Sequence, residues 1–258
     1  MNTKTAVVVG GGRSIGAYLC KHLAQNGYDV AVADLNGENA LNVAAEINAE
    51  GGKAVGYPCD ATNEASVVDL FANARKDLGN IYLMVYVAGI AKSKKITDFE
   101  LSDFNLCVNV NLTGYFLCAR EASRIMIEEG TKGRIIQINS KSGKEGSKFN
   151  SGYSASKFGG WGLTQSIALD LAPHGITVNA LMLGNLLSSD MFQSLVPSYA
   201  KKLGIPEEEV IPYYQAKTPM NRGCEFSDVA AVLTFYASEG ASYCTGQAIN
   251  ITGGQVMH

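Results

Sequence analysis

Residues 7–20 read VVVGGGRSIGAYLC, which is an apolar strand, a glycine-rich turn and the start of a helix. Gly10 permits a tight turn, and Gly12 lets the backbone come close to a pyrophosphate group. The helix that begins near Ser14 offers free N–H groups and a positive dipole end to the same anion. We predict a dinucleotide site here, formed by Gly10, Gly12, Arg13, Ser14, Ile15 and Gly16. A glycine cluster alone also fits a simple tight turn, so other residues must decide.

One position of this turn departs from the usual fingerprint, because Ser14 stands where a glycine is common. At a helix start, the serine hydroxyl can cap the backbone or donate to a phosphate oxygen, provided that the position needs no positive φ. We therefore expect the site to tolerate this serine.

Short β-branched runs alternate with helical patterns along the whole chain. Strands are predicted at residues 6–9, 29–33, 53–57, 82–87, 134–139, 177–183 and 247–251. Helices are predicted at residues 14–26, 38–50, 64–78, 112–128, 152–171 and 227–238. Strands joined by helical crossovers run parallel, and their continuous apolar character indicates that both faces of the sheet are covered. The pattern predicts a single-domain α/β fold over residues 1–258, a doubly wound parallel sheet of Rossmann type.

An irregular insertion at residues 186–222 interrupts this alternation. It carries four prolines, Pro197, Pro206, Pro212 and Pro219. Long insertions after a sheet strand are usually functional, and we predict that this one is a substrate lid.

Composition narrows the class of protein. The chain has 258 residues and a formal net charge of −3, without a long basic run, so we expect no nucleic-acid partner and no membrane surface. Its six cysteines are scattered without a C-x-x-C pair, which favours free thiols in a reducing compartment and no metal site. With no secretory segment and no apolar run long enough for a membrane span, a cytoplasmic, soluble protein is expected.

Acidic residues follow the second and third predicted strands. Asp34 lies 24 residues after Gly10, where a carboxylate accepts hydrogen bonds from adenosine ribose hydroxyls and repels a 2′-phosphate. This favours NAD over NADP as the cofactor, although Arg13 points the other way. Asp60, in the Cys59-Asp60-Ala61 stretch, either touches adenine or caps the next helix.

Two small residues end the fourth predicted strand. Ala88 and Gly89 provide a surface without bulk, against which a ribose could lie. Together with Asp60 and Ala61, they complete the predicted adenosine side of the site.

Tyr153 and Lys157 lie four residues apart, on one face of a predicted helix. A phenol with a pKa near 10 is a poor base at neutral pH, but an adjacent ammonium stabilises the phenolate and lowers that pKa. Tyr153 could then accept the proton of an alcohol while a hydride leaves for nicotinamide. A Tyr-x-x-x-Lys pair also arises by chance on many helices, so alone it is weak evidence.

Two further polar residues fit the same chemistry. Ser140 ends the fifth predicted strand, where it could hydrogen-bond the reacting oxygen or only cap a turn. Asn111 is an amide in an otherwise apolar helix, where it could be functional or only bend the helix.

The order and spacing of these residues, behind a glycine-rich first turn, resemble the short-chain dehydrogenase/reductase family over essentially the whole chain. The resemblance implies a catalytic group of Asn111, Ser140, Tyr153 and Lys157. It also implies that Lys157 holds the nicotinamide ribose and that Asn111 helps to hold a water chain that relays the proton. Asn111, Tyr153 and Lys157 would thus also contact the cofactor.

The family resemblance extends to the C-terminal third of the chain. Leu186 and Ser188 match the segment whose hydroxyl holds the nicotinamide carboxamide. Residues 242–254 resemble the end of family members that assemble as homotetramers. Three departures stand out: Ser14 in the turn, Tyr86-Val87 in place of two asparagines, and Leu183 in place of a proline. None of them touches the proton-transfer group.

Lysines cluster near the predicted reaction centre. Lys92 follows the fourth strand, and Lys141 and Lys144 follow Ser140 by one and four residues. A single lysine is ordinarily solvated loop charge, but a dianionic phosphate on the substrate would explain the group. We predict that the substrate is bound by Ser140, Tyr153, Lys141, Lys144, Lys92 and Asn185.

Residues 90–92, 114–121, 139–144 and 181–187 narrow the resemblance to family members that act on sugar-alcohol phosphates. This implies NAD-dependent oxidation of D-sorbitol 6-phosphate at C2 to D-fructose 6-phosphate. Alternatives are a family member acting on another polyol, sugar phosphate or 3-oxoacyl substrate, and an inactive NAD-binding redox sensor. The lysines argue against apolar substrates, and the intact Tyr153 and Lys157 pair argues against a sensor.

Overall fold

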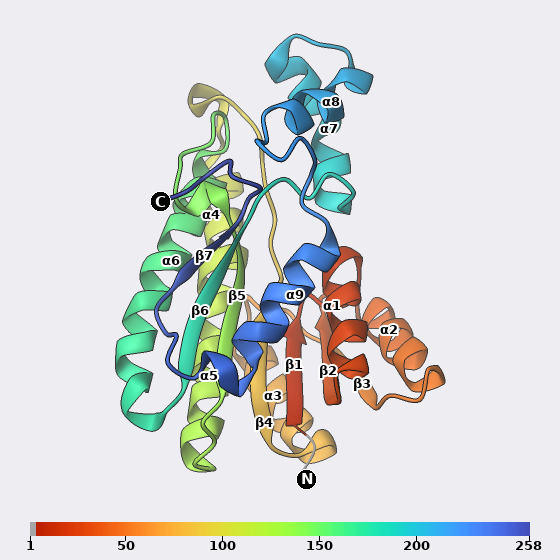
Figure 1. Ribbon diagram of the computed structural model, residues 1–258, viewed down its shortest axis with the longest axis vertical. Coiled ribbons are helices and arrows are strands. Elements are labelled where there is room, and N and C mark those ends of the chain that lie inside the picture. The colour runs from red at the N-terminus through yellow and green to blue at the C-terminus, as the bar shows by residue number, and fades with distance from the viewer. Residues whose placement is uncertain (1–3) are drawn as a thin grey trace.

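Seven parallel strands form one sheet in the order β3-β2-β1-β4-β5-β6-β7 (Figure 1). The computed structural model describes residues 4–258. The strands are β1 (Lys4–Val9), β2 (Tyr28–Asp34), β3 (Ala54–Pro58), β4 (Ile81–Tyr86), β5 (Arg134–Ser140), β6 (Thr177–Leu183) and β7 (Ala248–Ile251). This order is that of the Rossmann fold with one more strand at the β6 edge, so the predicted doubly wound sheet is confirmed.

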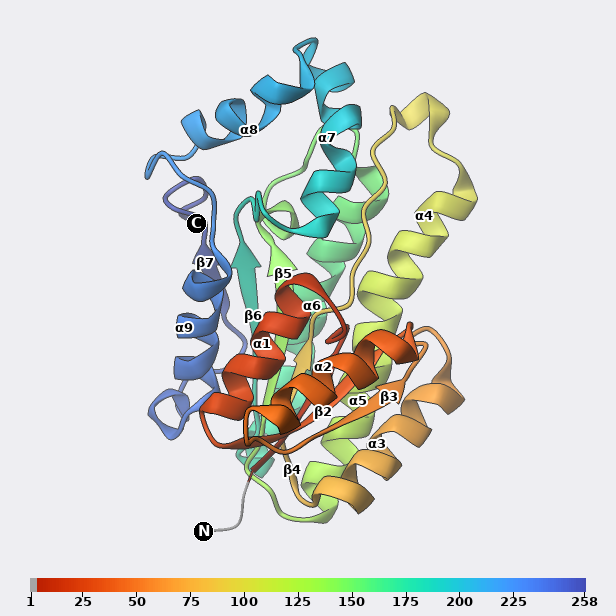
Figure 2. The ribbon, with the colours of Figure 1, turned by 90° about the vertical axis from the view of Figure 1, so that its right-hand side faces the viewer.

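Helices cover both faces of the sheet (Figure 2). One face carries α1 (Ser14–Gln25), α2 (Gly37–Ala49) and α9 (Phe226–Ala237). The other carries α3 (Glu64–Leu78), α5 (Gly114–Glu128) and α6 (Ser151–Leu171). Along β1, Ala6 and Val8 pack under the first group, whereas Val7 and Val9 pack under the second. A strand buried on both faces has no polar side, which explains its continuous apolar sequence.

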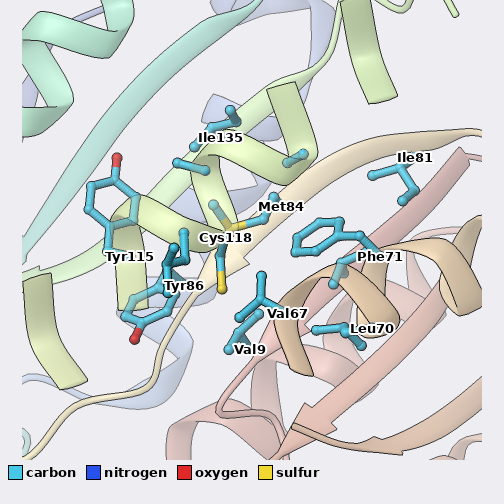
Figure 3. Packing of buried hydrophobic residues seen from close by; sticks show 14 of the residues in the cluster. Val9, Val67, Leu70, Phe71, Ile81, Met84, Tyr86, Tyr115, Cys118 and Ile135 are labelled. Carbon is cyan, nitrogen blue, oxygen red and sulfur yellow. The ribbon is translucent and has the colours of Figure 1, made fainter. Parts of the chain in front are cut away.

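Figure 3 shows the core beneath α3 and α5, where Phe71 lies near Met84 and Tyr115 lies beside Tyr86. The apolar stripe of the predicted helix at residues 112–128 is largely part of this core, because Tyr115, Ala119 and Met126 are fully buried. Leu112 is only partly buried, and Phe116 has 41% of its surface exposed.

The helix predicted at residues 112–128 is the end of a longer helical segment. It begins as α4 (Leu101–Val108), widens into a π-turn at η2 (Asn109–Thr113) and continues as α5. The prediction missed α4, a helix of only eight residues in which Cys107 alone is buried. Short turns of 3-10 helix are η1 (Ile96–Asp98), η3 (Lys141–Gly143), η4 (Ala172–His174) and η5 (Glu239–Ala241).

The segment at residues 186–222 is mostly helical, and the prediction of an irregular insertion was wrong. It forms α7 (Asp190–Leu203) and α8 (Glu207–Ala216), which stand beyond the carboxyl ends of the strands (Figure 1). Ser189 caps α7, and Gly204 ends it with a φ of 70°. These helices have an apolar cluster of their own, built around Phe192 and Val210. Each helix contains a proline, a residue that usually ends a helix, and for this reason no helix was predicted here.

Candidate active site

A cleft of about 360 Å³ opens at the carboxyl ends of β1 and β4, the strands at which the order of the sheet reverses. Of the residues predicted to form the site, those that line this cleft are Gly10, Arg13, Ser14, Ile15, Gly16, Asp34, Asp60, Ala61, Ala88, Gly89, Ser140, Lys141, Tyr153, Lys157, Asn185 and Leu186. Residues more than 100 positions apart in the chain are thus brought into one site.

Five predicted site residues do not line the cleft, namely Gly12, Lys92, Asn111, Lys144 and Ser188. Lys92 pairs with Asp103 at 3.7 Å. Lys144 donates to the backbone oxygen of Ala248 at 2.9 Å, so its charge is used within the fold. Ser188 is exposed to solvent, whereas the adjacent Ser189 lines the cleft.

The glycine-rich turn has the close packing that a dinucleotide site requires. Gly10 has a φ of 86°, and a Cβ at this residue would lie 2.5 Å from the Ala88 backbone nitrogen. A Cβ at Gly16 would lie 1.9 Å from the Gly10 oxygen. Since no other residue fits at either position, the turn brings backbone N–H groups and the start of α1 to the cleft, as a pyrophosphate requires.

Ser14 has a φ of 49°, in the left-handed region that favours glycine. We expected the site to tolerate a serine here only if the position needed no positive φ, and that condition is not met. Ser14 also does not cap α1, whose N-cap is Arg13. Instead, the Ser14 hydroxyl accepts a hydrogen bond of 3.3 Å from the backbone nitrogen of Asp190. Ser14 thus joins the glycine-rich turn to the first residue of α7.

The Asp34 carboxylate is held in place at the end of β2. It accepts hydrogen bonds from the backbone nitrogens of Gly12 at 2.9 Å and Asn36 at 3.0 Å. One carboxylate oxygen takes each bond, which leaves lone pairs for the two hydroxyls of a ribose. Gly12 therefore contributes to the site by positioning Asp34.

Asp60 does not cap the helix that follows it, because Asn63 is the N-cap of α3. Its carboxylate accepts instead from the backbone nitrogen and the hydroxyl of Thr62, at 2.9 and 2.7 Å. Asp60 closes a local turn at the rim of the cleft.

Tyr153 and Lys157 lie one helical turn apart on α6, and the Lys157 Nζ is 5.6 Å from the centre of the Tyr153 ring. Burial raises the pKa of Tyr153 above its ordinary value of 10.0, and the neighbouring Ser140 hydroxyl acts in the opposite direction. Burial also lowers the pKa of Lys157 to about 8. Burial, rather than the ammonium, therefore dominates the pKa of Tyr153, contrary to the sequence expectation.

Ser140 caps a short turn and also lines the cleft. Its side chain accepts a bond of 3.1 Å from the Ser142 nitrogen and so caps η3. The backbone nitrogen of Ser140 is bound by the Asn139 side chain at 2.7 Å, which fixes the end of β5.

Asn111 is fully buried in the π-turn behind the cleft. Its carboxamide accepts from the Ile90 nitrogen at 2.8 Å and donates to the Ile90 oxygen at 2.9 Å. It also donates to the Ser156 hydroxyl at 2.9 Å. Asn111 thus connects the loop after β4 with the helix that carries Tyr153 and Lys157, and π-turns commonly occur at functional sites.

Sequence reasoning missed the aromatic part of the cleft. Phe192 and Tyr199 of α7 and Tyr214 of α8 line it and contact one another, with ring centres 5.4 to 5.5 Å apart. The spacing of Phe192 and Tyr199, two turns apart on one helix face, was the available signal.

Two classes of feature are absent from residues 4–258. This part of the chain contains no cluster of three or more side chains suited to bind a metal ion. In the same residues, no helix is both long and apolar enough to cross a bilayer.

The chain belongs to the short-chain dehydrogenase family, whose model matches residues 4–200. Within this family, the chain is highly similar in sequence to an enzyme of known activity. It is 61% identical to sorbitol-6-phosphate 2-dehydrogenase of Escherichia coli strain K12, over 98% of this chain and 99% of that protein. The predicted family is therefore confirmed.

Solved structures agree with this grouping. The crystal structure of sorbitol-6-phosphate 2-dehydrogenase SrlD from Erwinia amylovora matches with a TM-score of 0.96 and 63% identity, over 98% of this chain and 100% of that one. A more distant match is the actinorhodin polyketide ketoreductase with NADPH, with a TM-score of 0.94 and 30% identity, over 98% of this chain and 97% of that one.

Proposed function

We propose that this protein oxidises D-sorbitol 6-phosphate at C2 to D-fructose 6-phosphate, with NAD as the oxidant. The observation that carries the proposal is the 61% identity, over nearly the whole chain, to a sorbitol-6-phosphate 2-dehydrogenase. The cleft supports it, because Ser140, Tyr153 and Lys157 all line it. A redox sensor without catalysis has no need of a phenol in the cleft beside a buried amine.

The proposed reaction breaks one C–H bond and one O–H bond of the substrate. NAD, when bound, supplies the acceptor for the hydride that leaves C2. Ser140 hydrogen-bonds the C2 oxygen, and the ionised Tyr153 accepts the hydroxyl proton as the carbonyl forms. Lys157, whose Nζ donates to the Ile138 oxygen at 3.1 Å, stays at a fixed position beside the Tyr153 ring. Asn111 keeps the loop after β4 against α6 through its bonds to Ile90 and Ser156.

The preference for NAD rests on Asp34. Its carboxylate lines the cleft at the end of β2, where it would accept from ribose hydroxyls and repel a 2′-phosphate. Arg13 also lines the cleft, but a single exposed cation does not remove the repulsion from a carboxylate held by two backbone bonds. Leu186 and Ser188 stay proposed as cofactor contacts in the segment that follows β6.

Residues 1–258 are proposed to form one domain, with 186–222 as the substrate lid. We propose a cytoplasmic homotetramer. An apolar groove lined by Leu112, Phe116 and Leu163 supports the assembly, because exposed aromatic and aliphatic side chains commonly mark an interface between subunits.

The assay follows the absorbance of the reduced cofactor at 340 nm, with NAD or NADP as the oxidant. The substrates are sorbitol 6-phosphate, sorbitol, other polyols and the substrate pair of a 3-oxoacyl reductase. We expect the highest kcat/KM with sorbitol 6-phosphate and NAD. Equal turnover of sorbitol and sorbitol 6-phosphate would contradict the phosphate specificity, and turnover of no substrate would favour the sensor.

A further inference from the structure

Three lysines from separate segments act electrostatically on one another beside the cleft, and of the three only Lys141 lines it. Lys141 belongs to η3 and lines the cleft beside Ser140. Lys202 belongs to the last turn of α7, and Lys217 caps the end of α8. Only Lys141 belongs to the body of the fold, whereas the other two belong to the lid. We call these three residues the lysine cluster.

Lys141 is a partly buried cation without a counterion. Within residues 4–258, its Nζ forms neither an ion pair nor a side-chain hydrogen bond, in contrast to Lys92 and Lys144. Burial lowers the pKa of Lys141 to about 8, and the ammonium groups of Lys217 and Lys202 act in the same direction, whereas Glu145 opposes them. A desolvated ammonium next to two others raises the free energy of the unliganded protein.

The lid lysines are held toward this region by neutral groups. Lys202 donates to the Lys148 backbone oxygen at 2.7 Å and lies 5.6 Å from the centre of the Tyr199 ring. Lys217 lies 3.5 Å from the Tyr213 hydroxyl. In the described part of the chain neither lysine is paired with a carboxylate, so no ion pair within the protein competes with a ligand for them.

We propose that the lysine cluster binds the phosphate group of the substrate, with Lys141 on one side of the anion and Lys202 and Lys217 on the other. This inference rests on the proposed function, since it assigns the phosphate of sorbitol 6-phosphate. Lys141 follows Ser140 directly, so the cluster lies next to the reacting end of the cleft. A dianion offsets the repulsion among the three ammonium groups, whereas a neutral sugar leaves it in place.

The assignment replaces two lysines of the sequence prediction. Lys92 and Lys144 are closer in sequence to the catalytic residues, but one is paired with Asp103 and the other with backbone oxygens. Lys202 and Lys217 lie 61 and 76 residues after Lys141, and only the packing of α7 and α8 over the cleft brings them near it. Because two of the three cations are in the lid, binding of the phosphate also holds the lid against the body of the protein.

The test compares Lys141→Met, Lys202→Met and Lys217→Met with wild type. Lys201→Met is the matched control, since it removes an exposed charge from the same helix, one residue away from Lys202. For each protein, kcat/KM is measured with sorbitol 6-phosphate and with sorbitol, and binding of inorganic phosphate is measured by calorimetry. We expect each of the three variants to lose about tenfold or more in the preference for sorbitol 6-phosphate over sorbitol, and to bind phosphate more weakly. Lys201→Met keeps the wild-type values.

Lys141→Arg serves as the conservative variant, because it keeps the charge and regains most of the preference if charge is the cause. If wild type prefers sorbitol 6-phosphate and the three variants keep that preference, the lysine cluster is not the phosphate site, while the proposed function stands. If wild type shows no such preference, the proposed function fails and phosphate binding decides: binding lost in Lys141→Met but kept in Lys201→Met supports the site. Equal phosphate binding by all variants overturns it.

Discussion

At the scale of single residues, burial and backbone conformation set the properties of the site more than the pairing of residue types does. Lys157 is buried and Tyr153 is half-buried, and burial favours the neutral form of each. Proton acceptance by Tyr153 then depends on the small fraction of phenolate, so the rate of oxidation should rise with pH through the neutral range.

Tyr153→Phe tests the proton acceptor. We expect kcat to fall about 10²- to 10⁴-fold, because the phenyl ring cannot accept a proton, while NAD still protects the protein against thermal unfolding. The residual rate should lose its pH dependence. Tyr236→Phe, on α9, is the control and should behave as wild type. Near-normal turnover of Tyr153→Phe would exclude the mechanism.

At Ser14, glycine should give a more stable protein than alanine, whereas alanine is the more stable choice at an ordinary helix position. With a φ of 49°, Ser14→Gly relieves strain, whereas Ser14→Ala keeps the strain and loses the hydroxyl. We expect the glycine variant to be more stable than the alanine variant by about 1 kcal/mol, the reverse of the usual helix preference. Ser14→Gly should change NAD affinity without abolishing turnover. Denaturant unfolding and NAD titration measure both, and an inactive glycine variant would give the hydroxyl an essential role.

Lys157 should make the stability of the folded protein depend on pH. Its pKa falls from 10.5 to about 8 on folding, so the unfolded chain binds more protons between these two pH values. The free-energy penalty for burying the charged lysine therefore disappears as the pH rises through this range. Lys157→Met removes the penalty and the bond to Ile138. We expect it to be about 2 kcal/mol more stable than wild type at pH 7.

That stability difference should shrink as pH rises from 8 toward 10. The comparison of two variants is needed because buried thiols such as Cys20 and Cys118, whose pKa is raised by burial, destabilise both proteins alike at high pH. Urea unfolding at pH 7.0 and 9.5 measures the difference. A gap that is constant or that widens with pH would contradict the assignment of the penalty to Lys157.

At the scale of elements, the proposed lid at residues 186–222 is a small structure with its own apolar cluster. The Ser189 hydroxyl caps α7 by accepting a bond of 3.2 Å from the Phe192 nitrogen. The sequence did not indicate these helices, because a proline removes a hydrogen bond in each and their stability comes from contacts between Phe192, Tyr199 and Tyr214.

Ser189→Ala should destabilise α7 by about 1 kcal/mol, through the loss of its cap. Because the lid cluster is separate from the two main cores, we expect a higher KM for the substrate and more rapid hydrogen exchange in α7, with little change in Tm. Ser194→Ala removes an exposed hydroxyl from the same helix and is the control. A large fall in Tm would show that the lid and the body unfold together.

At the scale of the whole molecule, the sheet and its two layers follow from the sequence, whereas the lid and part of the site do not. All seven strands were predicted to within two residues at each end. The five inner strands are buried on both faces and have an unambiguous apolar signal, whereas the edge strands β3 and β7 are only partly buried. The residues of the cleft that end a strand or follow it, such as Asp34 and Ser140, could be placed for the same reason. Lys202 and Tyr214 could not, since only tertiary packing brings them to the cleft.

Phe116 tests the proposed assembly. The aromatic ring is 41% exposed beside the apolar groove on α5 and α6. We expect Phe116→Glu to dissociate the oligomer, because it places a charge in an apolar interface. Phe235→Glu, at a half-exposed residue of α9 on the opposite face of the sheet, is the control. Light scattering with size exclusion gives the mass, and an unchanged tetramer in Phe116→Glu would locate the interface elsewhere.

The π-turn between α4 and α5 has a consequence for the length of the chain. The Gly114 nitrogen bonds to the Asn109 oxygen, five residues back, so the turn holds one residue more than a regular helix does. Each residue of an α-helix adds about 100° of rotation. Deleting one residue here would let the helix wind regularly, but α5 would then rotate against α4, and either Asn111 would leave Ile90 or Tyr115 would leave the core. A single-residue deletion at this turn should therefore be far more damaging than one in the exposed loop at residues 50–53.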